Sequence, residues 1–331
     1  MNLLVLTNNP ERASFRQRIG VYLDILRDNG IECEVVRFPS GSLARRKLFK
    51  RSVKFDGVFL HKKRLNFLDA FWLRRCAGKV IYDFDDAIMY SDKHPDRPSH
   101  KRQKSFQRTV KLADMVIADN SYLANHARNF NTNVEVLTTG LNVSNYKRNV
   151  SPPDDGKLRL VWIGSKSTLP YLAQIKPALE EIGSYFDNVI LRIICDDFFD
   201  LQNMEVEKHR WSLQNQVIDL ATSHIGLAPL PDDRFARGKS GGFKILQYAA
   251  AGLPVVASRG VNAECVREGV NGFLAAVRSD WVDKISRLLK DSQLRKQMGQ
   301  AGRVEVQQFD LKVLGKQLVN LIKGCVKNTE T

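Results

Sequence analysis

The stretch from Gly238 to Val256 constrains the fold of this chain more than any other part of its sequence. A small, basic, glycine-bearing loop leads into a predicted helix that begins near Phe243. Gly252 favours the left-handed conformation that ends such a helix, and Pro254 prevents the helix from continuing. The apolar residues from Val255 onward then predict a buried strand. Helix and strand are therefore expected to form adjacent layers of one α/β sheet.

The same loop and helix start predict a site for a diphosphate. The first N–H groups of a helix have no partners within the helix, and they lie at the positive end of its dipole. A lysine beside them can neutralise a departing diphosphate, which makes Lys239 a candidate catalytic residue as well as a binding residue. The candidate binding residues of the loop are Lys239, Ser240, Gly241, Gly242, Phe243 and Lys244.

Short apolar runs alternate with helix-like stretches along the chain, as in parallel sheets with helices on both faces. In the first half, strands are predicted near residues 3–7, 32–38, 55–61, 79–83, 115–118 and 134–137. In the second half, they are predicted at 158–164, 189–195, 225–229 and 255–258. Because 331 residues exceed what one ordinary core organises, we expect two domains joined by the polar, proline-bearing stretch 147–157.

Positive charge is concentrated in the first half of the chain. Residues 1–150 contain 27 Lys+Arg and 15 Asp+Glu, so +12 of the net charge of +15 lies there. We therefore expect this half to meet an anionic partner. The basic segment 43–54 predicts a helix that lies on a membrane surface or, alternatively, docks on its own domain with a solvated basic side. No nucleic-acid-binding motif accompanies the charge, so no nucleic acid partner is expected.

Other features indicate a cytoplasmic protein. The sequence has no run of eighteen apolar residues, and its first residues resemble a buried strand rather than a signal peptide. The five cysteines are scattered without a C-x-x-C pair. Free thiols and no structural metal are expected.

The order of motifs after residue 238 also resembles a known family. The pattern is Gly-Lys-x3-Phe-Lys-x2-Gln-Tyr-x-Ala-x-Gly-x-Pro-Val-Val, followed by the glycine turns at 260–264 and 269–273. It resembles the donor-binding half of bacterial family 4 retaining glycosyltransferases, most closely over residues 158–327. The chain departs from the family at Lys239 and Gln247, where two glutamates are usual.

The resemblance implies a GT-B fold, which consists of two Rossmann-like, doubly wound parallel-sheet domains with an interdomain cleft. Residues 1–150 would form the acceptor-binding domain and residues 151–310 the nucleotide-sugar donor-binding domain. Residues 311–331 would form a helix that packs back on the N-terminal domain.

The resemblance also implies a retaining hexosyltransferase that uses a nucleotide-sugar. The acceptor would be an anionic glycan or lipid-linked molecule in bacterial cell-surface polysaccharide or lipopolysaccharide synthesis, with no metal or other cofactor. The enzyme would be cytoplasmic or peripheral on the inner face of the cell membrane. Two alternatives stay open on the same scaffold, namely a non-catalytic sugar-nucleotide or glycan binding protein and a sugar-nucleotide epimerase.

Further donor-side candidates follow a predicted strand or match the family pattern. Ligands of open α/β sheets bind at the carboxyl ends of strands, and a polar turn follows the strand 158–164. The same turn could instead cap a helix. Gln247 and Glu264 occupy positions that the resemblance places beside the nucleotide, although Glu264 could also cap the helix after it. These donor-binding candidates are Gly164, Ser165, Lys166, Thr168, Gln247 and Glu264.

Acceptor-side candidates lie at the carboxyl ends of strands in the first half. Asp83, Asp85 and Asp86 include a D-x-D pattern that can bind a metal, but basic residues in the other domain already supply charge for the diphosphate. One of these three aspartates is expected to orient or deprotonate the acceptor hydroxyl. The alternative is a cap for the next helix. Candidate residues for an anionic acceptor are Arg16, Arg18, Lys62 and Lys63, followed by Arg64.

Overall fold

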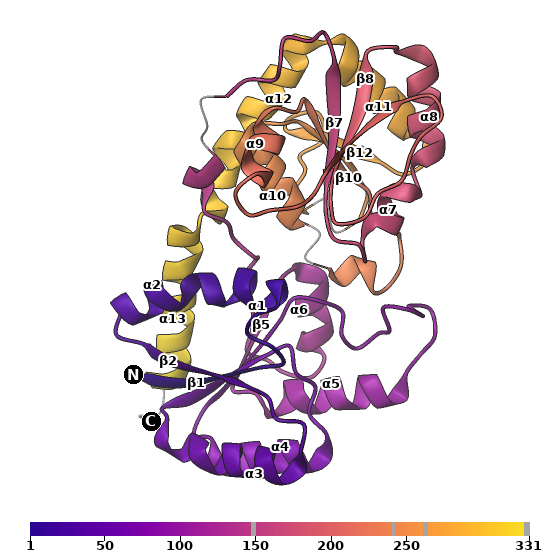
Figure 1. Cartoon of the computed structure of the whole chain (residues 1–331). Helices are drawn as coiled ribbons and strands as arrows, with labels where there is room; N and C mark the ends of the chain where they lie inside the picture. Colours follow the sequence, from indigo (N-terminus) through magenta and orange to yellow (C-terminus); the bar gives the residue numbers. More distant parts are fainter. Residues whose placement is uncertain (147–149, 240–241, 261–263, 328–331) are drawn as a thin grey trace. The chain divides into compact units, whose positions relative to one another are not determined.

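The computed structural model describes residues 1–146, 150–239, 242–260 and 264–327, which form two compact units (Figure 1). Unit 1 consists of the described parts of 1–140, 233–240 and 311–331. Unit 2 consists of the described parts of 141–232 and 241–310. The change from one unit to the other thus lies at residue 140, before the expected boundary at 150, and the short segment 233–239 belongs to unit 1.

Unit 1 is built on a parallel sheet of six strands in the order β2-β1-β3-β4-β5-β6. The strands are β1 (Asn2–Thr7), β2 (Glu32–Arg37), β3 (Gly57–His61), β4 (Val80–Phe84), β5 (Met115–Ala118) and β6 (Val134–Val136). The register places Leu6 opposite Leu60 and His61 opposite Asp83. All six strands run in the same direction, so their carboxyl ends meet at one edge, where polar residues follow.

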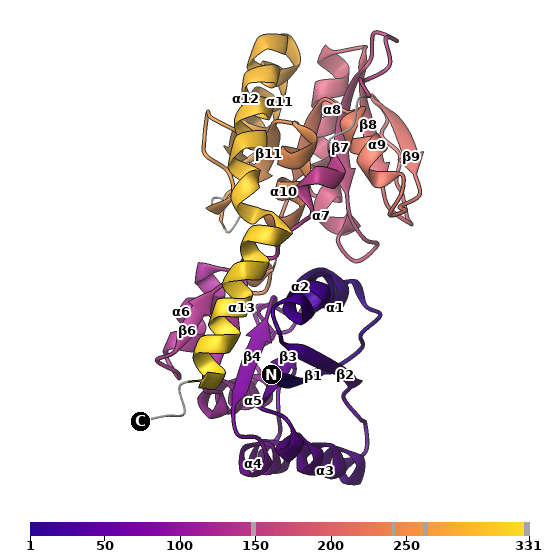
Figure 2. The same ribbon diagram turned by 90° about the vertical axis from the view of Figure 1, so that its left-hand side faces the viewer.

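Helices cover both faces of this sheet. They are α1 (Ala13–Arg18), α2 (Leu23–Asp28), α3 (Ser42–Arg51), α4 (Phe67–Cys76), α5 (His100–Leu112), α6 (Ser121–Arg128) and α13 (Leu311–Lys327). A short 3-10 turn, η1 (Gly20–Tyr22), separates α1 from α2. Helix α13 packs against α2 and η1, where a Cβ at Gly315 would lie 2.8 Å from Ile25 Cδ1 (Figure 2).

The basic segment after residue 42 forms α3, which lies beside α4 in both views (Figures 1 and 2). Leu48, Phe49 and Ser52 of this region are buried in unit 1, whereas Leu43 and Val53 are exposed. Helix α3 therefore packs on its own domain, which is the second of the two alternatives for this segment. Of the helices that the structure describes, none is long and apolar enough to cross a bilayer.

Unit 2 contains a second six-stranded parallel sheet, in the order β12-β11-β10-β7-β8-β9. The strands are β7 (Leu158–Ile163), β8 (Val189–Ile194), β9 (Glu205–His209), β10 (Ile225–Ala228), β11 (Val255–Ser258) and β12 (Gly272–Ala275). The helices are α7 (Leu169–Ala173), α8 (Lys176–Tyr185), α9 (Gln216–Ala221), α10 (Gly242–Ala251), α11 (Arg278–Lys290) and α12 (Ser292–Glu305). Helix α10 ends before Gly252, whose φ of 79° is left-handed, as the sequence predicted.

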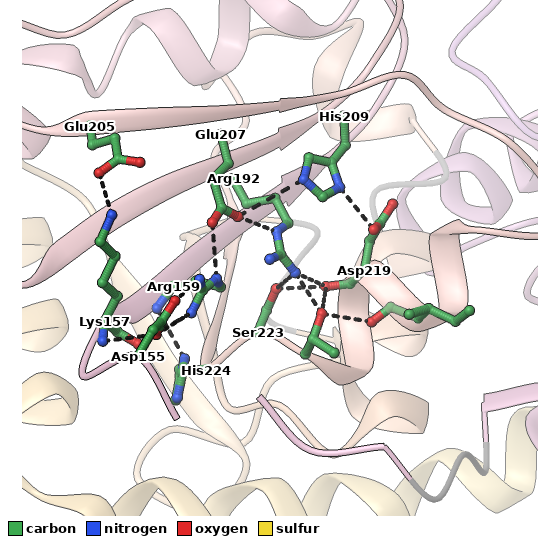
Figure 3. A network of polar contacts seen from close by, with 12 residues as sticks. Asp155, Lys157, Arg159, Arg192, Glu205, Glu207, His209, Asp219, Ser223 and His224 are labelled. Atoms are coloured by element: carbon green, nitrogen blue, oxygen red, sulfur yellow. Dashed lines mark hydrogen bonds and ion pairs between the residues drawn. The ribbon is translucent and has the colours of Figure 1, made fainter. Parts of the chain in front are cut away.

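A polar network holds the edge strand β9 to its sheet (Figure 3). The carboxylate of Glu207 accepts from Arg159 Nε at 3.1 Å and from Arg192 Nε at 2.7 Å, and both arginines are buried. At the end of the strand, His209 Nδ1 lies 2.8 Å from Asp219 Oδ1. Four of the five residues of β9 are polar or charged, so its sequence carries no strand pattern, and this strand was not predicted.

Candidate functional site

Three carboxylates follow one another where β4 ends, but their surroundings differ. The side chain of Asp83 is 1% exposed, that of Asp85 is 10% exposed and that of Asp86 is 25% exposed. Asp83 therefore lies within the interior of unit 1, and Asp86 is the most accessible to a bound molecule.

A buried arginine accounts for Asp83. The Nη2 atom of Arg18 lies 2.8 Å from Asp83 Oδ1, and its Nη1 atom lies 3.1 Å from Asp119 Oδ1. The guanidinium also donates to the carbonyl of Leu137. Arg18 is only 2% exposed and Asp83 only 1%, so neither the predicted acceptor contact of Arg18 nor the predicted catalytic role of Asp83 has support in its accessibility. The two residues form a buried structural pair. The sequence around Arg18 did not reveal this buried ion pair, because its partners Asp83 and Asp119 are far away in sequence.

Lys62 organises the two remaining carboxylates. Its Nζ atom lies 2.9 Å from Asp85 Oδ1, pairs with Asp86 Oδ2 and donates to Ser14 Oγ at 3.2 Å. The backbone of Lys62 has φ of 52°, which a residue other than glycine seldom adopts, and its N–H donates to the carbonyl of Asp83 at 2.7 Å. The structure thus holds Lys62 in an unusual conformation with its ammonium between the two acids, so this predicted residue has a positioning role there.

The two acids of this cluster differ in pKa. Burial opposes ionisation of Asp85, but Lys62 and His61 outweigh it and lower the pKa of Asp85. Burial raises the pKa of Asp86, although Lys62 opposes the rise. Asp86 is therefore the stronger base of the pair and the more exposed one, which suits a group that accepts a proton.

Lys239 belongs to unit 1, where it lies beside this cluster, whereas α10 belongs to unit 2. Asn120, the residue that caps α6, donates through Nδ2 to the carbonyl of Lys239 at 3.4 Å. The preceding Gly238 packs so closely on Ala87 that an added Cβ would lie 2.9 Å from the backbone nitrogen of Ala87. The charge of Lys239 also lowers the pKa of Asp86, as a minor contribution after burial and Lys62. The expected diphosphate loop is therefore divided between the two units.

A cavity of about 340 Å³ opens beside Lys62, entirely within unit 1. Its wall comes from the loop after β1, the first turn of α1, the end of β3, the start of α5 and the segment 233–239. The lining residues are Thr7, Asn8, Asn9, Arg12, Ser14, Phe15, His61, Lys62, Arg64, Ile88, Asp92, Arg102 and Phe235. The sequence did not single out Arg12 and Arg102, although the basic character of residues 1–150 indicated an anionic partner.

Two predicted acceptor residues do not line this cavity. Arg16 is exposed in α1. Lys63 donates through Nζ to Asn8 Oδ1 at 3.0 Å, and the same atom lies 4.5 Å from the centre of the Phe38 ring. Their roles stay predictions.

His61 forms part of the cavity wall and is 3% exposed. Its Nδ1 atom lies 3.1 Å from Thr7 Oγ1, and its ring packs edge-on against Phe15. Within the described residues, no group forms a hydrogen bond to its buried Nε2 atom. Burial lowers the pKa of His61 to about 4, so the ring is neutral at physiological pH. The unsatisfied ring nitrogen adds a polar group to the cavity wall.

The low pKa of His61 predicts how acid affects stability. The ring protonates near pH 6.5 in an unfolded chain and near 4 in the folded protein. As pH falls from 6.5 to 4, the unfolded state binds more protons, so stability that is present above pH 6.5 is lost toward pH 4. The loss from this group is expected to reach about 3 kcal/mol. Urea unfolding at several pH values, compared between wild type and His61→Gln, would measure it.

The exposed His94 provides the matched control. A His94→Gln variant should follow the pH dependence of the wild type, whereas His61→Gln should lose less stability on acidification. Parallel curves for His61→Gln and wild type would show that the folded protein does not suppress protonation of His61.

In unit 2, the predicted donor residues after β7 form a compact turn. Ser165 N donates to Thr168 Oγ1 at 3.1 Å, and a Cβ at Gly164 would overlap the Trp162 ring. Lys166 pairs with Asp197 at 3.0 Å on the surface. The Nζ atom of Lys244, from the first turn of α10, lies 4.3 Å from the centre of the Trp162 ring. The turn after β7 and the start of α10 are thus brought together, as the diphosphate prediction requires.

The other predicted donor residues have different environments. Gln247 is 5% exposed, and its Nε2 atom donates to Tyr146 Oη at 3.0 Å and to Gln216 Oε1 at 3.3 Å. This buried amide network stabilises unit 2. Because the Gln247 side chain is buried, its accessibility does not support the expected contact with a nucleotide.

Glu264 lines a second cavity, of about 140 Å³, with Arg267 and Glu305. A Cβ at Gly242 would lie 2.5 Å from Cys265 Sγ, and Phe243 is half-buried.

Ser240 and Gly241 lie outside the described residues. Among the residues that are described, no group of three or more His, Cys, Asp or Glu side chains gathers as a metal site would.

Comparisons with known proteins agree with the expected fold. Residues 203–291 match the family model of group 1 glycosyl transferases, a segment that runs from β9 to α11. No curated protein is similar enough to the chain to count as a match.

Solved structures match nearly the whole chain at low sequence identity. HepE from Anabaena, in complex with UDP, has a TM-score of 0.72 and is 16% identical over 98% of this chain and 100% of its own. A glycosyltransferase from Rickettsia africae has a TM-score of 0.75 at 15% identity, with 99% of each chain covered. WaaG, a glycosyltransferase involved in lipopolysaccharide biosynthesis, has a TM-score of 0.69 at 14% identity, with 97% of this chain and 100% of its own covered. The chain therefore has the GT-B fold of glycosyltransferases.

Proposed function

We propose that this protein is a glycosyltransferase that moves a sugar from a nucleotide-sugar to an acceptor hydroxyl, with retention at the anomeric carbon. The match of residues 203–291 to group 1 glycosyl transferases carries the proposal, because that segment includes α10 and most of the predicted diphosphate site. The similarity to HepE, whose structures contain UDP, UDP-glucose or UDP with glucose, supports a nucleotide-sugar donor. The similarity to WaaG supports a role in lipopolysaccharide or another cell-surface polysaccharide.

Each unit contributes one substrate site in this proposal. Unit 2 binds the donor diphosphate at the start of α10 and the turn after β7. The role of Lys239, to neutralise the departing diphosphate, is kept in this proposal as the sequence predicted it. Unit 1 binds the acceptor, with Asp86 as the group that orients its hydroxyl and accepts the proton. Lys62 and Asp85 hold Asp86 in place. The proposal includes no divalent metal, and the pairing of Arg18 with Asp83 and of Lys62 with Asp85, the two carboxylates of the D-x-D pattern, supports that part of it.

The location of the protein is part of the same proposal. The basic side of α3, with exposed Leu43 and Val53, would contact the anionic inner face of the cell membrane. Sedimentation with phosphatidylglycerol vesicles tests this contact, and a protein that stays in solution would refute it.

Calorimetric titration with UDP, GDP, ADP, CMP and dTDP tests the donor site. We expect one nucleotide to bind in the micromolar range. The Lys239→Ala variant should bind it at least about tenfold more weakly, because a charge-assisted hydrogen bond is lost. The exposed Lys104 of α5 supplies the control, and Lys104→Ala should bind as the wild type does. If no nucleotide binds, the donor site is refuted.

The matching nucleotide-sugars are then tested for turnover with EDTA present. Transfer requires both a nucleotide-sugar and an acceptor, so nucleotide release should depend on added glycan. Interconversion of the sugar without an acceptor would instead identify an epimerase. Binding without turnover on any acceptor would support a non-catalytic sugar-nucleotide binding protein.

A further inference from the structure

The cavity of unit 1 contains three arginines from separate parts of the chain. Arg12 precedes α1, Arg64 follows β3, and Arg102 lies in the first turn of α5. The fold therefore brings together guanidinium groups that are far apart in sequence. The same wall contains Lys62, which contacts Asp86, so the cavity lies beside the acid that we assign to the acceptor hydroxyl.

These arginines lack the carboxylate partners that the neighbouring cations have. Lys62 is compensated by Asp85 and Asp86. In contrast, no described carboxylate lies within ion-pair distance of Arg12, Arg64 or Arg102. Arg102 Nη1 donates only to a neutral group, the carbonyl of Tyr90, at 2.9 Å. The cavity lining does include one acidic residue, Asp92, but its side chain is exposed to solvent.

The positive charges at this wall disfavour one another. Burial lowers the pKa of Arg64, and the charge of Arg102 lowers it further. Two partly buried cations without a counter-charge are unfavourable, because each has lost part of its hydration. An anion between them would remove the repulsion, and the planar guanidinium matches phosphate and carboxylate oxygens in particular.

His61 adds a neutral polar atom to the same wall. Its buried Nε2 has no partner among the described residues, and a sugar hydroxyl can donate to this atom or accept from it. A cavity of about 340 Å³ is at the lower end of the sizes of small-molecule sites, which begin near ~300 Å³. Such a space suits one charged sugar unit better than a long glycan.

We infer that this cavity binds a phosphate or carboxylate group carried by the acceptor sugar, held by Arg64 and Arg102 with Arg12 at the rim. This inference rests on the proposed function for the identity of the ligand as an acceptor. A sugar anchored in this way places its hydroxyls beside Lys62 and Asp86. The acceptor class is therefore a phosphorylated sugar or a uronic acid.

Titration of the full chain with glucose 6-phosphate, glucuronic acid and glucose tests the inference. We expect at least one anionic sugar to bind at least about tenfold more tightly than glucose. Whichever of glucose 6-phosphate and glucuronic acid binds more tightly shows whether the cavity prefers a phosphate or a carboxylate. The Arg64→Gln/Arg102→Gln variant should lose this preference. The matched control is Lys101→Gln/Lys104→Gln, which removes the same charge from exposed positions on α5 and should keep it.

Two outcomes would overturn the assignment. One is equal binding of charged and neutral sugars by the wild type, and the other is an undiminished preference in the double variant. If circular dichroism shows that the double variant does not fold, the single variants Arg12→Gln and Arg64→Lys decide the question, because a bidentate guanidinium contact is lost in each. The protein could also prefer anionic sugars in an Arg64-dependent way and yet show no transfer activity. That result would support the cavity assignment and refute the proposed function.

Discussion

Sugar transfer by an Asp86→Asn variant is expected to be slower than wild type by a factor of about 10² to 10⁴, which is the usual contribution of a positioned general base. The asparagine keeps the shape of the side chain but cannot accept the proton of the acceptor hydroxyl. Lys62 retains Asp85 and Ser14 as partners in this variant, so its position is preserved. The measurement is kcat for nucleotide release at saturating donor and acceptor.

If Asp86 is the general base, the rate of sugar transfer by the wild type should also depend on pH. Because burial raises the pKa of Asp86, transfer should begin to fail on acidification at a higher pH than an ordinary aspartate would give. Asp28 on α2 is exposed, and Asp28→Asn serves as the control with unchanged kcat. If Asp86→Asn transfers at the wild-type rate, another group, such as the departing phosphate, accepts the proton.

Replacement of Arg18 by methionine is expected to lower the free energy of unfolding by about 3–5 kcal/mol, the range observed when one partner of a buried ion pair is removed. Methionine fills much of the volume but leaves Asp83 and Asp119 buried without a cation. Urea unfolding followed by circular dichroism would measure the loss.

Two further variants separate charge from packing at this position. Arg16→Met changes an exposed arginine of the same helix and should stay within about 0.5 kcal/mol of wild type. Adding Asp83→Asn and Asp119→Asn to Arg18→Met should recover part of the lost stability, since no buried carboxylate is then left unpaired. A loss below about 1 kcal/mol for Arg18→Met alone would show that this network contributes little.

Local chemistry explains why the sequence predicted most of the two sheets. Residues such as those of β1 and β8 form continuous apolar runs, because a central parallel strand is buried on both faces. The end of α10 was also predictable, since Gly252 and Pro254 act through their own backbone geometry. In contrast, β9 is a polar edge strand, and β12 begins within the glycine turn 269–273, so neither carries a clear strand pattern.

The roles of charged residues were less predictable, because they depend on partners that only the fold brings together. Arg18 resembles an exposed helical arginine until Asp83 and Asp119 are placed beside it. Lys239 precedes α10 in sequence, yet its neighbours are Asn120 and the Asp86 cluster. The arginine-lined cavity is a similar case, since Arg12, Arg64 and Arg102 meet only after β1, β3 and α5 are assembled.

Helix α13 also has a consequence for the order in which the protein is assembled on the ribosome. The strands of unit 1 are complete by residue 140, but the helix that covers α2 and η1 begins only at Leu311. At a translation rate of roughly 5–20 residues per second, the interval is roughly 10–35 s. During that time the apolar surface around Tyr22 and Ile25 awaits its cover, which makes the nascent first unit a substrate for chaperones that bind exposed apolar segments.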